Sequence, residues 1–363
     1  MTRYPSKKSA LSVSKGVAQP DAVSNEAVSR LKKAIKGKPS ASLLFEGIRS
    51  ANISSLGRAI TLVESSHPKH QSEAQKLISL CLPFSGKALR VGITGVPGAG
   101  KSTFIEALGK HIISSGGKLA VLAVDPSSER SKGSILGDKT RMEELAGSSE
   151  AFIRPSPSGG TLGGVARKTR ETIILCEAAG FDTIFVETVG VGQSETAVHS
   201  MVDFFLLIMI AGAGDELQGI KRGIMEMADA VIVNKADGEQ LQAAGQAASD
   251  IRSALRLTPR NKDDLEISVL TASALTGQGV NYAWDHIEER IRVKRESGEF
   301  KNRRDDQRRD WFENAVEYLL RSQITADQSL SDLKRDLISE VYSGKRHPVS
   351  AASALVDAIR GKS

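Results

Sequence analysis

The sequence predicts an α/β fold in which a mainly parallel sheet is flanked by helices, with a helical N-terminal arm and a helical C-terminal extension. From residue 88 onward, short apolar runs alternate with helical stretches, which is typical of parallel strands joined by crossover helices. The longest apolar run, Phe204 to Ala211, is too short to span a bilayer and is typical of a central buried strand. The strand candidates are 89–94, 119–124, 151–154, 183–187, 204–210, 230–234 and 266–271.

The remaining chain is mostly helical in pattern, and it divides into four segments. Residues 1–24 are a basic tail expected to be disordered, 25–87 are the helical N-terminal arm, 88–279 are the α/β domain, and 280–363 are a helical C-terminal region. The helix candidates are 25–35, 41–64, 71–82, 103–113, 280–296, 302–323, 328–342 and 349–360.

The C-terminal helices carry apolar stripes that need a cover. Packing within the chain and pairing with a second subunit both satisfy this need, and the sequence leaves the two open. The run Arg303 to Asp310 mixes both signs of charge, which indicates a solvated or salt-bridged helix face. The stripe residues are Trp311, Val316, Leu319, Leu320, Leu333, Leu337 and Val341.

Composition indicates a soluble globular protein. The 363 residues are 40% hydrophobic and 25% charged, with a net charge of +6 and a pI near 9.2. The basic residues are interspersed with acids, so we expect neither nucleic-acid binding nor membrane insertion. Two distant cysteines exclude a disulfide framework and favour a reducing compartment. The first 20 residues faintly resemble a transit peptide, although a disordered basic tail explains them better.

A glycine-rich segment between the first strand and the next helix fits the pattern G-x-x-x-x-G-K-[ST]. Its glycines let backbone N–H groups turn toward a polyphosphate at the positive end of the helix. The lysine then reaches the β and γ phosphates, and the serine hydroxyl is a ligand for Mg²⁺. An ordinary glycine turn rarely ends in Gly-Lys-Ser after a strand, so the pattern predicts a P-loop nucleoside triphosphatase. The nucleotide-binding candidates are Gly95, Val96, Pro97, Gly98, Ala99, Gly100, Lys101, Ser102 and Thr103.

The base is predicted from two loops that follow later strands. Asp237, in Asn234-Lys235-Ala236-Asp237, accepts hydrogen bonds from N1–H and the 2-amino group of guanine, whereas adenine has neither donor. We expect Lys235 to lie along the base and Asn234 to tie this loop to the phosphate loop. Ser273, Ala274 and Leu275 match the backbone contact to guanine O6. Together these loops favour GTP and GDP over adenine nucleotides.

Carboxylates at strand ends indicate a Mg²⁺ site. Glu187, in Glu187-Thr188-Val189-Gly190, stands where GTPases usually carry an aspartate, and Gly190 is placed to sense the γ phosphate. Asp125 and Asp138 are further candidates, which with Ser102 and Glu187 complete the predicted metal set. The alternative for Asp125 is that it only caps the turn that it begins.

These motifs together closely resemble the methylmalonyl-CoA mutase-associated GTPases of the MeaB/ArgK type, within the cofactor-insertion GTPases. The likeness runs from about residue 40 to the C-terminus. It rests on 95–102, Val124 to Ser128, Gly137 to Met142, Glu187 to Glu195 and Asn234 to Asp237.

The resemblance implies a GTP-hydrolysing chaperone for an adenosylcobalamin-dependent acyl-CoA mutase. Such proteins are homodimers that gate delivery of the B12 cofactor, protect the mutase and help to remove damaged cofactor. By likeness, Arg141 lies near the phosphates, and Gln218 and Lys221 belong to a loop that communicates with the mutase. A cytoplasmic location is implied, or the mitochondrial matrix in a eukaryote.

Catalysis in this class is mostly positioning. Lys101, Mg²⁺ held in part by Glu187, and the loop amides neutralise charge on the γ phosphoryl group while water attacks in line. In small GTPases a glutamine directly after the switch glycine orients that water. Here Val191 takes that position and Gln193 stands two residues later, so we expect slow hydrolysis without a partner. Lys101, Glu187, Arg141 and Gln193 are the catalytic candidates.

Three other interpretations stay open. One is an ATP-dependent kinase associated with transport, against which Asp237 argues. Another is a nickel-insertion GTPase, although the six histidines are scattered and His67 and His70 are expected at the surface. The third is a pure switch, in which hydrolysis only resets a conformation. The sequence does not choose among methylmalonyl-CoA, isobutyryl-CoA and ethylmalonyl-CoA mutases.

Overall fold

A computed structural model describes most of the chain. The described residues are 40–65, 67–124, 142–155, 162–188, 194–212, 222–257 and 266–361. All described residues after Ser40 belong to one compact unit, Ala41–Ser363. The predicted tail 1–24 and the predicted helix 25–35 lie outside the described residues.

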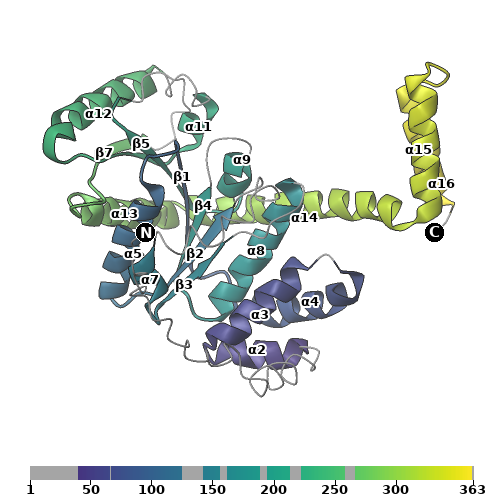
Figure 1. Cartoon of the computed structure of the whole chain (residues 1–363), viewed down its shortest axis with the longest axis horizontal. Helices are drawn as coiled ribbons and strands as arrows, with labels where there is room; N and C mark the ends of the chain where they lie inside the picture. Colours follow the sequence, from purple (N-terminus) through teal and green to yellow (C-terminus); the bar gives the residue numbers. More distant parts are fainter. Residues whose placement is uncertain are drawn as a thin grey trace, which may run out of the picture. The chain divides into compact units, whose positions relative to one another are not determined.

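The described residues form a seven-stranded parallel sheet with strand order β3-β2-β4-β1-β5-β6-β7 (Figure 1). Its strands β2, β4 and β5 are buried along almost their whole length, because a parallel sheet is covered on both faces. Every strand candidate is confirmed, with shifts of one or two residues at three ends. The strands are β1 (Leu89–Gly95), β2 (Leu119–Val124), β3 (Ala151–Arg154), β4 (Thr183–Thr188), β5 (Phe204–Ile210), β6 (Ala230–Asn234) and β7 (Ser268–Thr271).

Two hydrophobic clusters fill the two faces of the sheet. Along β1, Val91 and Ile93 join one cluster, whereas Gly92 faces Phe205 of the other, as the twofold alternation of a strand requires. The helices of the first cluster are α5 (Lys101–Ser114), α7 (Glu143–Ala146), α11 (Arg222–Met227), α12 (Leu241–Arg256) and α13 (Val280–Glu296). The helices of the second are α2 (Ala41–Arg49), α3 (Ile53–Glu64), α4 (Pro68–Cys81), α8 (Leu162–Ala178) and α9 (Ser194–His199).

The N-terminal arm differs from prediction in two details. The stretch 41–64 is two helices, because Ala51 adopts a left-handed conformation with φ of 55° and Asn52 caps the second helix by accepting from the Ser55 N–H at 2.9 Å. The arm packs on α8, where the Arg49 guanidinium donates to the carbonyl of Ala178 at 2.7 Å. The predicted helix 71–82 begins earlier, at Pro68, and short 3-10 turns follow at η1 (Leu82–Phe84) and η2 (Gly238–Gln240).

The C-terminal helices are α13, α14 (Glu299–Ala326), α15 (Gln328–Tyr342) and α16 (Pro348–Arg360). α14 packs on α8 and α13, and α15 packs on α14 and α16 (Figure 1). The residues of the predicted apolar stripe differ in burial. Trp311 packs on the second cluster and Leu337 is buried, whereas Leu319 and Leu320 are 53% and 52% exposed.

The charged run was interpreted as a solvated or salt-bridged helix face, and its arginines do form salt bridges. Arg308 and Arg309 are exposed and pair with aspartates on the same helix. Arg304 is instead buried, because its guanidinium reaches the carboxylate of Asp203 at 2.6 and 2.7 Å. Across the described ranges, no helix combines the length and the apolar character needed to cross a bilayer.

Candidate nucleotide site

The phosphate loop joins β1 to α5 at the carboxyl edge of the sheet. Gly98 and Gly100 adopt left-handed conformations with φ of 77° and 82°, which glycine takes without strain. A side chain on Gly95 would collide with the carbonyl oxygen of Ile208 on β5. The loop between a strand end and a helix start is the place where backbone N–H groups bind phosphate, as the sequence predicts.

Lys101 and Ser102 begin α5 and point back over the loop. The Lys101 ammonium donates to the carbonyl oxygens of Gly95 and Val96 at 2.9 and 3.2 Å. These bonds hold the ammonium at the loop, beside the backbone that is expected to receive the phosphates. Val96 and Ala99 are buried and anchor the loop, while Pro97, Gly98 and Thr103 are exposed.

Ser102 and Glu187 are brought together from distant parts of the chain. The Ser102 hydroxyl donates to Oε1 of Glu187 at 3.3 Å, and Glu187 is only 5% exposed near the end of β4. Register places Glu187 beside Ile93 of β1 and Ala123 of β2. A hydroxyl and a carboxylate at the edge of the phosphate loop are oxygen donors of the kind that Mg²⁺ prefers, so the residues present fit that ion.

A buried hydrogen bond, which the sequence did not reveal, supports this arrangement. The Thr188 hydroxyl donates to the Thr94 hydroxyl at 2.8 Å, and both side chains are fully buried. Thr94 precedes the phosphate loop and Thr188 follows Glu187, so the bond ties the two strand ends together. In the sequence each threonine is next to a predicted site residue, and this position is the one signal that could have indicated the bond.

Asn234 connects the phosphate loop with the two loops, after β6 and after β7, that are predicted to bind the guanine base. The Asn234 side chain donates to the carbonyl of Ala99 at 2.8 Å and accepts from the Ala274 N–H at 3.0 Å. Asn234 therefore ties together the phosphate loop, the end of β6 and the loop after β7. The amide lies so close that a side chain on Gly100 would stand 2.8 Å from its nitrogen.

Lys235 and Asp237, the residues predicted to contact the base, lie in the loop after β6. Lys235 is exposed with φ of 60°, a conformation that a non-glycine residue adopts only where the surroundings impose it, and its side chain passes Gly100. Asp237 is half-buried, and none of the described residues donates a hydrogen bond to its carboxylate. Ser273 is fully buried, while Leu275 is 81% exposed, so the loop after β7 offers its backbone.

Several predicted residues lie outside the described residues. They are Asp125, Asp138, Arg141, Gly190, Gln193, Gln218 and Lys221. Their roles remain predictions. In the part of the chain that the structure describes, no group of three or more His, Cys, Asp or Glu side chains is placed to hold a metal.

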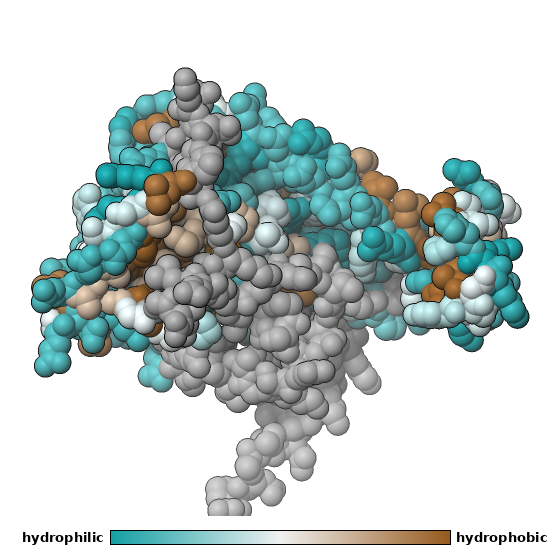
Figure 2. All heavy atoms as spheres, turned by 90° about the horizontal axis from the view of Figure 1, so that it is seen from above, coloured by the Kyte–Doolittle hydropathy of each residue, from teal (hydrophilic) through white to brown (hydrophobic). Residues whose placement is uncertain are grey.

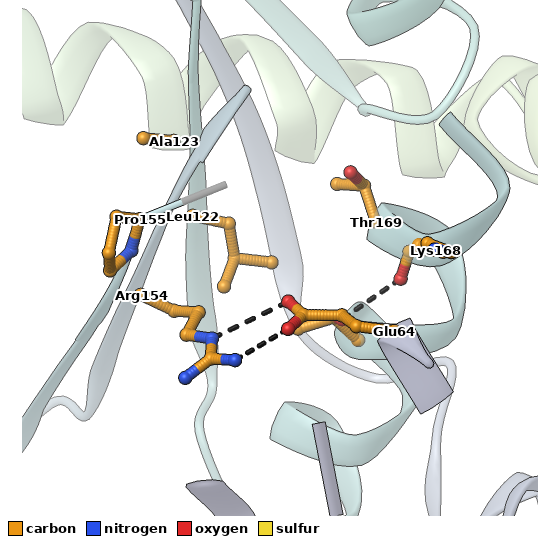
Figure 3. A pocket seen from close by; sticks show the side chains of 8 residues that line it. Glu64, Leu122, Ala123, Arg154, Pro155, Lys168 and Thr169 are labelled. Atoms are coloured by element: carbon orange, nitrogen blue, oxygen red, sulfur yellow. Dashed lines mark hydrogen bonds and ion pairs between the residues drawn. The ribbon is translucent and has the colours of Figure 1, made fainter. Parts of the chain in front are cut away.

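A small pocket lies near the ends of β2 and β3 (Figure 3). Arg154 reaches across it to pair with Glu64 of α3, and burial lowers the pKa of the neighbouring Lys168. Its volume of about 10 Å³ is that of roughly one water molecule, so it holds no substrate. The Arg154–Glu64 pair instead joins the N-terminal arm to the sheet.

The fold and the site together define a P-loop nucleotide hydrolase with a base loop of the guanine-binding kind. Comparison with known proteins then shows its family. Residues 56–329 match the family described as methylmalonyl-CoA mutase-associated GTPase MeaB, and the chain belongs to that family. It is therefore a GTPase, as the motifs predict.

Individual relatives agree with this assignment. A protein of Caulobacter vibrioides named as a GTPase is 51% identical over 315 residues, which are 87% of this chain and 95% of the relative. The mitochondrial methylmalonic aciduria type A homolog of Mus musculus is 44% identical over 329 residues, covering 88% of this chain and 79% of the relative. A crystal structure titled LAO/AO transport system kinase has a TM-score of 0.70 at 36% identity and covers 89% of this chain and 99% of that one.

Proposed function

We propose that this GTPase is a chaperone that gates delivery of adenosylcobalamin to a B12-dependent acyl-CoA mutase, and that protects or reactivates that mutase. The observation that carries the proposal is membership of a family named for its association with methylmalonyl-CoA mutase. The murine relative, named for methylmalonic aciduria, supports the same link. We place this protein in the cytoplasm, or in the mitochondrial matrix of a eukaryote, since its two cysteines are free and buried, as in a reducing compartment.

Hydrolysis by this site is positioning and charge neutralisation. Lys101 and the loop amides bind the phosphates, and Ser102 and Glu187, with Asp125 and Asp138, hold Mg²⁺, which supplies positive charge at the phosphates. Gly190 senses the γ phosphate. Arg141 and Gln193 complete the catalytic set, as a phosphate contact and as a group that orients water.

Guanine selection by Asp237 is the sharpest test of the nucleotide assignment. The carboxylate satisfies two donors on guanine, whereas adenine presents none of them. Asp237→Asn should weaken GDP binding by about 100-fold or more, because a charged acceptor pair is lost. Calorimetry with GDP and ADP measures this effect, with the nearby exposed Glu239→Gln as the matched control. ADP binding as tight as GDP binding would favour the alternative of an ATP-dependent kinase associated with transport.

Coupling to the mutase is the second test. We expect the mutase to raise the rate of GTP hydrolysis by acting through the segments 189–196 and 214–221. Lys221→Ala or Gln218→Ala should reduce that increase while leaving the rate without the mutase unchanged, and the exposed Lys345→Ala serves as the control. Equal turnover with and without the mutase counts against the proposal.

Cofactor gating is measured directly by transfer of adenosylcobalamin to the apo-mutase. Transfer in the presence of GTP should exceed transfer in the presence of a non-hydrolysable GTP analogue. Equal transfer, combined with mutase affinities that differ between GDP and the analogue, would instead identify a pure switch. Stoichiometric Ni²⁺ binding in equilibrium dialysis would favour a nickel-insertion GTPase.

The exposed apolar residues of α14 support a homodimer. Phe312, Val316, Leu319 and Leu320 are between 39% and 69% exposed on one helix, and brown hydrophobic residues gather over the C-terminal helices in Figure 2. A contiguous patch of this kind marks an interface. Leu320→Glu should convert the dimer to a monomer in light scattering, and the exposed Arg321→Glu on the same turn should not. A wild-type chain that is monomeric at micromolar concentration would contradict this proposal.

A further inference from the structure

A cavity of about 110 Å³ opens at the edge of the sheet opposite the phosphate loop. It lies among the start of β1, helix α8, the residues that precede β5, and helix α14. The residues that matter for its chemistry are Arg90, Arg170, Ile174, Met201, Arg304 and Trp311. Since the phosphate loop follows the carboxyl end of β1 and Arg90 stands at its amino end, this cavity is separate from the nucleotide site.

Two of the arginines in this cavity are neutralised by buried carboxylates. The Arg90 guanidinium lies 2.9 Å from Glu177, whose side chain is 1% exposed. Arg304 pairs with Asp203, also 1% exposed, at 2.6 Å. The charges of Arg90 and Arg304 are thus balanced by carboxylates, so these two pairs add little net charge to the wall of the cavity.

Arg170 on α8 is different. One of its terminal nitrogens donates to the carbonyl and the hydroxyl of Ser200, at 2.9 and 2.8 Å, which fixes the guanidinium plane. Among the described residues, no carboxylate lies within ion-pair distance of Arg170, and Asp310 offsets its charge only at longer range. Burial accordingly lowers the pKa of Arg170, as expected for a cation that has lost water without gaining a counter-ion.

Arg308 also lines the cavity, but it pairs with Asp305 on its own helix; Ser85 and Gln307 are polar, and the rest of the wall is apolar. Trp311 of α14 stands with its ring centre 5.8 Å from the Arg170 guanidinium carbon, and Met201, which also lines the cavity, is 2% exposed. Ile174 lies one turn along α8 from Arg170. The cavity thus offers one uncompensated positive charge next to hydrocarbon, which suits a singly charged anion with an apolar stem better than a dianion.

We propose that this cavity is a second ligand site, which binds a carboxylate group carried on a short apolar stem. The carboxylate pairs with the edge of Arg170 that faces away from Ser200, and the stem packs on Trp311 and Ile174. The same chemistry is offered by a free organic acid and by an acidic side chain of another protein.

The test uses the full-length protein, with butyrate and its neutral isostere butyramide as probes. Butyrate should change the fluorescence of Trp311 saturably, and the change should be absent in Trp311→Phe; butyramide should have no effect. Calorimetry provides an independent measure of the same affinity. Butylphosphonate binding more tightly than butyrate would overturn the assignment to carboxylates.

Arg170→Met should weaken butyrate binding about ten-fold or more, because a charge-assisted hydrogen bond is lost. Arg321→Met, on an exposed arginine of α14, is the matched control and should bind butyrate as the wild type does. Unchanged GTP hydrolysis in Arg170→Met shows that the variant is folded. Equal butyrate affinity in the wild type and Arg170→Met, or no butyrate binding to either, would overturn the proposal.

A second ligand series separates the two sources of the carboxylate. N-acetylglutamate amide carries the acidic side chain on a blocked backbone, whereas butyrate is a free acid. Tighter binding of butyrate assigns the site to a small organic acid, and tighter binding of the blocked glutamate assigns it to a protein side chain. Binding of butyrate and of the blocked glutamate is measured without GTP. The absence of binding would therefore not contradict the proposed chaperone function.

Discussion

Asn234 shows how much of the site depends on one side chain. It is 1% exposed, and its amide satisfies the carbonyl of one loop and the N–H of another. A buried amide that bridges two loops holds both at a fixed separation, so a nucleotide meets a site that is already formed.

Asn234→Ala should therefore weaken GDP binding about ten-fold or more and destabilise the fold by about 1–3 kcal/mol, since two buried backbone groups lose their partner. Calorimetry and urea unfolding measure the two effects. Asn314→Ala is the matched control, because Asn314 makes its hydrogen bond on the exposed face of α14. Full GDP affinity in Asn234→Ala would show that the loops hold their positions without it.

His199 gives the fold a dependence on pH. The pKa of His199 is lowered from 6.5 to about 4, mainly by burial and also by the charges of Arg303 and Lys294, while Asp229 opposes these effects. The unfolded chain binds a proton near pH 6.5, whereas the folded chain does not until about pH 4. Stability should therefore fall as the pH is lowered through this window, by at most about 3 kcal/mol from this group.

His199→Gln tests this effect, because glutamine takes up no proton. The free energy of unfolding in urea, measured at several pH values from 4 to 7, should fall less steeply for His199→Gln than for the wild type. The exposed His347→Gln is the control. Parallel curves for wild type and His199→Gln would contradict the prediction.

Helix α14 is held to the sheet by a buried ion pair rather than by a broad apolar face. Arg304 donates to Asp203 and also to the carbonyl of Ala88 at 2.7 Å, and its guanidinium lies over the Phe300 ring at 4.5 Å. Asp203 in turn accepts from the backbone N–H of Arg90 at 2.8 Å. One arginine thus connects α14 to the amino ends of both β1 and β5.

Arg304→Met should cost about 3–5 kcal/mol of stability, because Asp203 would be left buried without its partner. Arg309→Met, five residues along the same helix, should cost less than about 1 kcal/mol, since Arg309 is 64% exposed. Thermal and urea unfolding measure the difference. Equal stabilities for these two variants would show that the pair is not what holds α14.

Individual elements were predicted to different degrees. The helices 280–296 and 328–342 were predicted at their observed bounds, because glycine or aspartate marks their starts and their apolar residues recur at helical spacing. Helix α8 was not predicted by its residues. It is covered by α3, α4 and α14, and it buries Thr169, Thr172 and Glu177 along with apolar residues, which weakens the periodic signal.

Nucleotide binding should stabilise the molecule as a unit, because the site joins β1, β4, β6 and β7. GDP with Mg²⁺ at 100 times its dissociation constant should add about 2.7 kcal/mol to the free energy of unfolding. Removal of Mg²⁺ by a chelator should reduce this gain if Ser102 and Glu187 hold the ion. Thermal unfolding with GDP, with and without chelator, measures both effects. A gain in the free energy of unfolding that is the same with and without chelator would argue against the metal assignment.

Local pattern in the chain was enough to predict the parallel sheet, the phosphate loop and the guanine loop, because each depends on residues within a few positions of one another. The meeting of Ser102 with Glu187, and of Asn234 with the phosphate loop at Ala99, was expected from strand ends that share one edge, whereas the bond from Ala274 to Asn234 was not predicted. The burial of Arg304, the Thr94–Thr188 bond and the cavity around Arg170 were decided only when helices packed on the sheet. The residues next to a charged or polar side chain in the sequence do not identify its partner, since that partner can lie a hundred residues away.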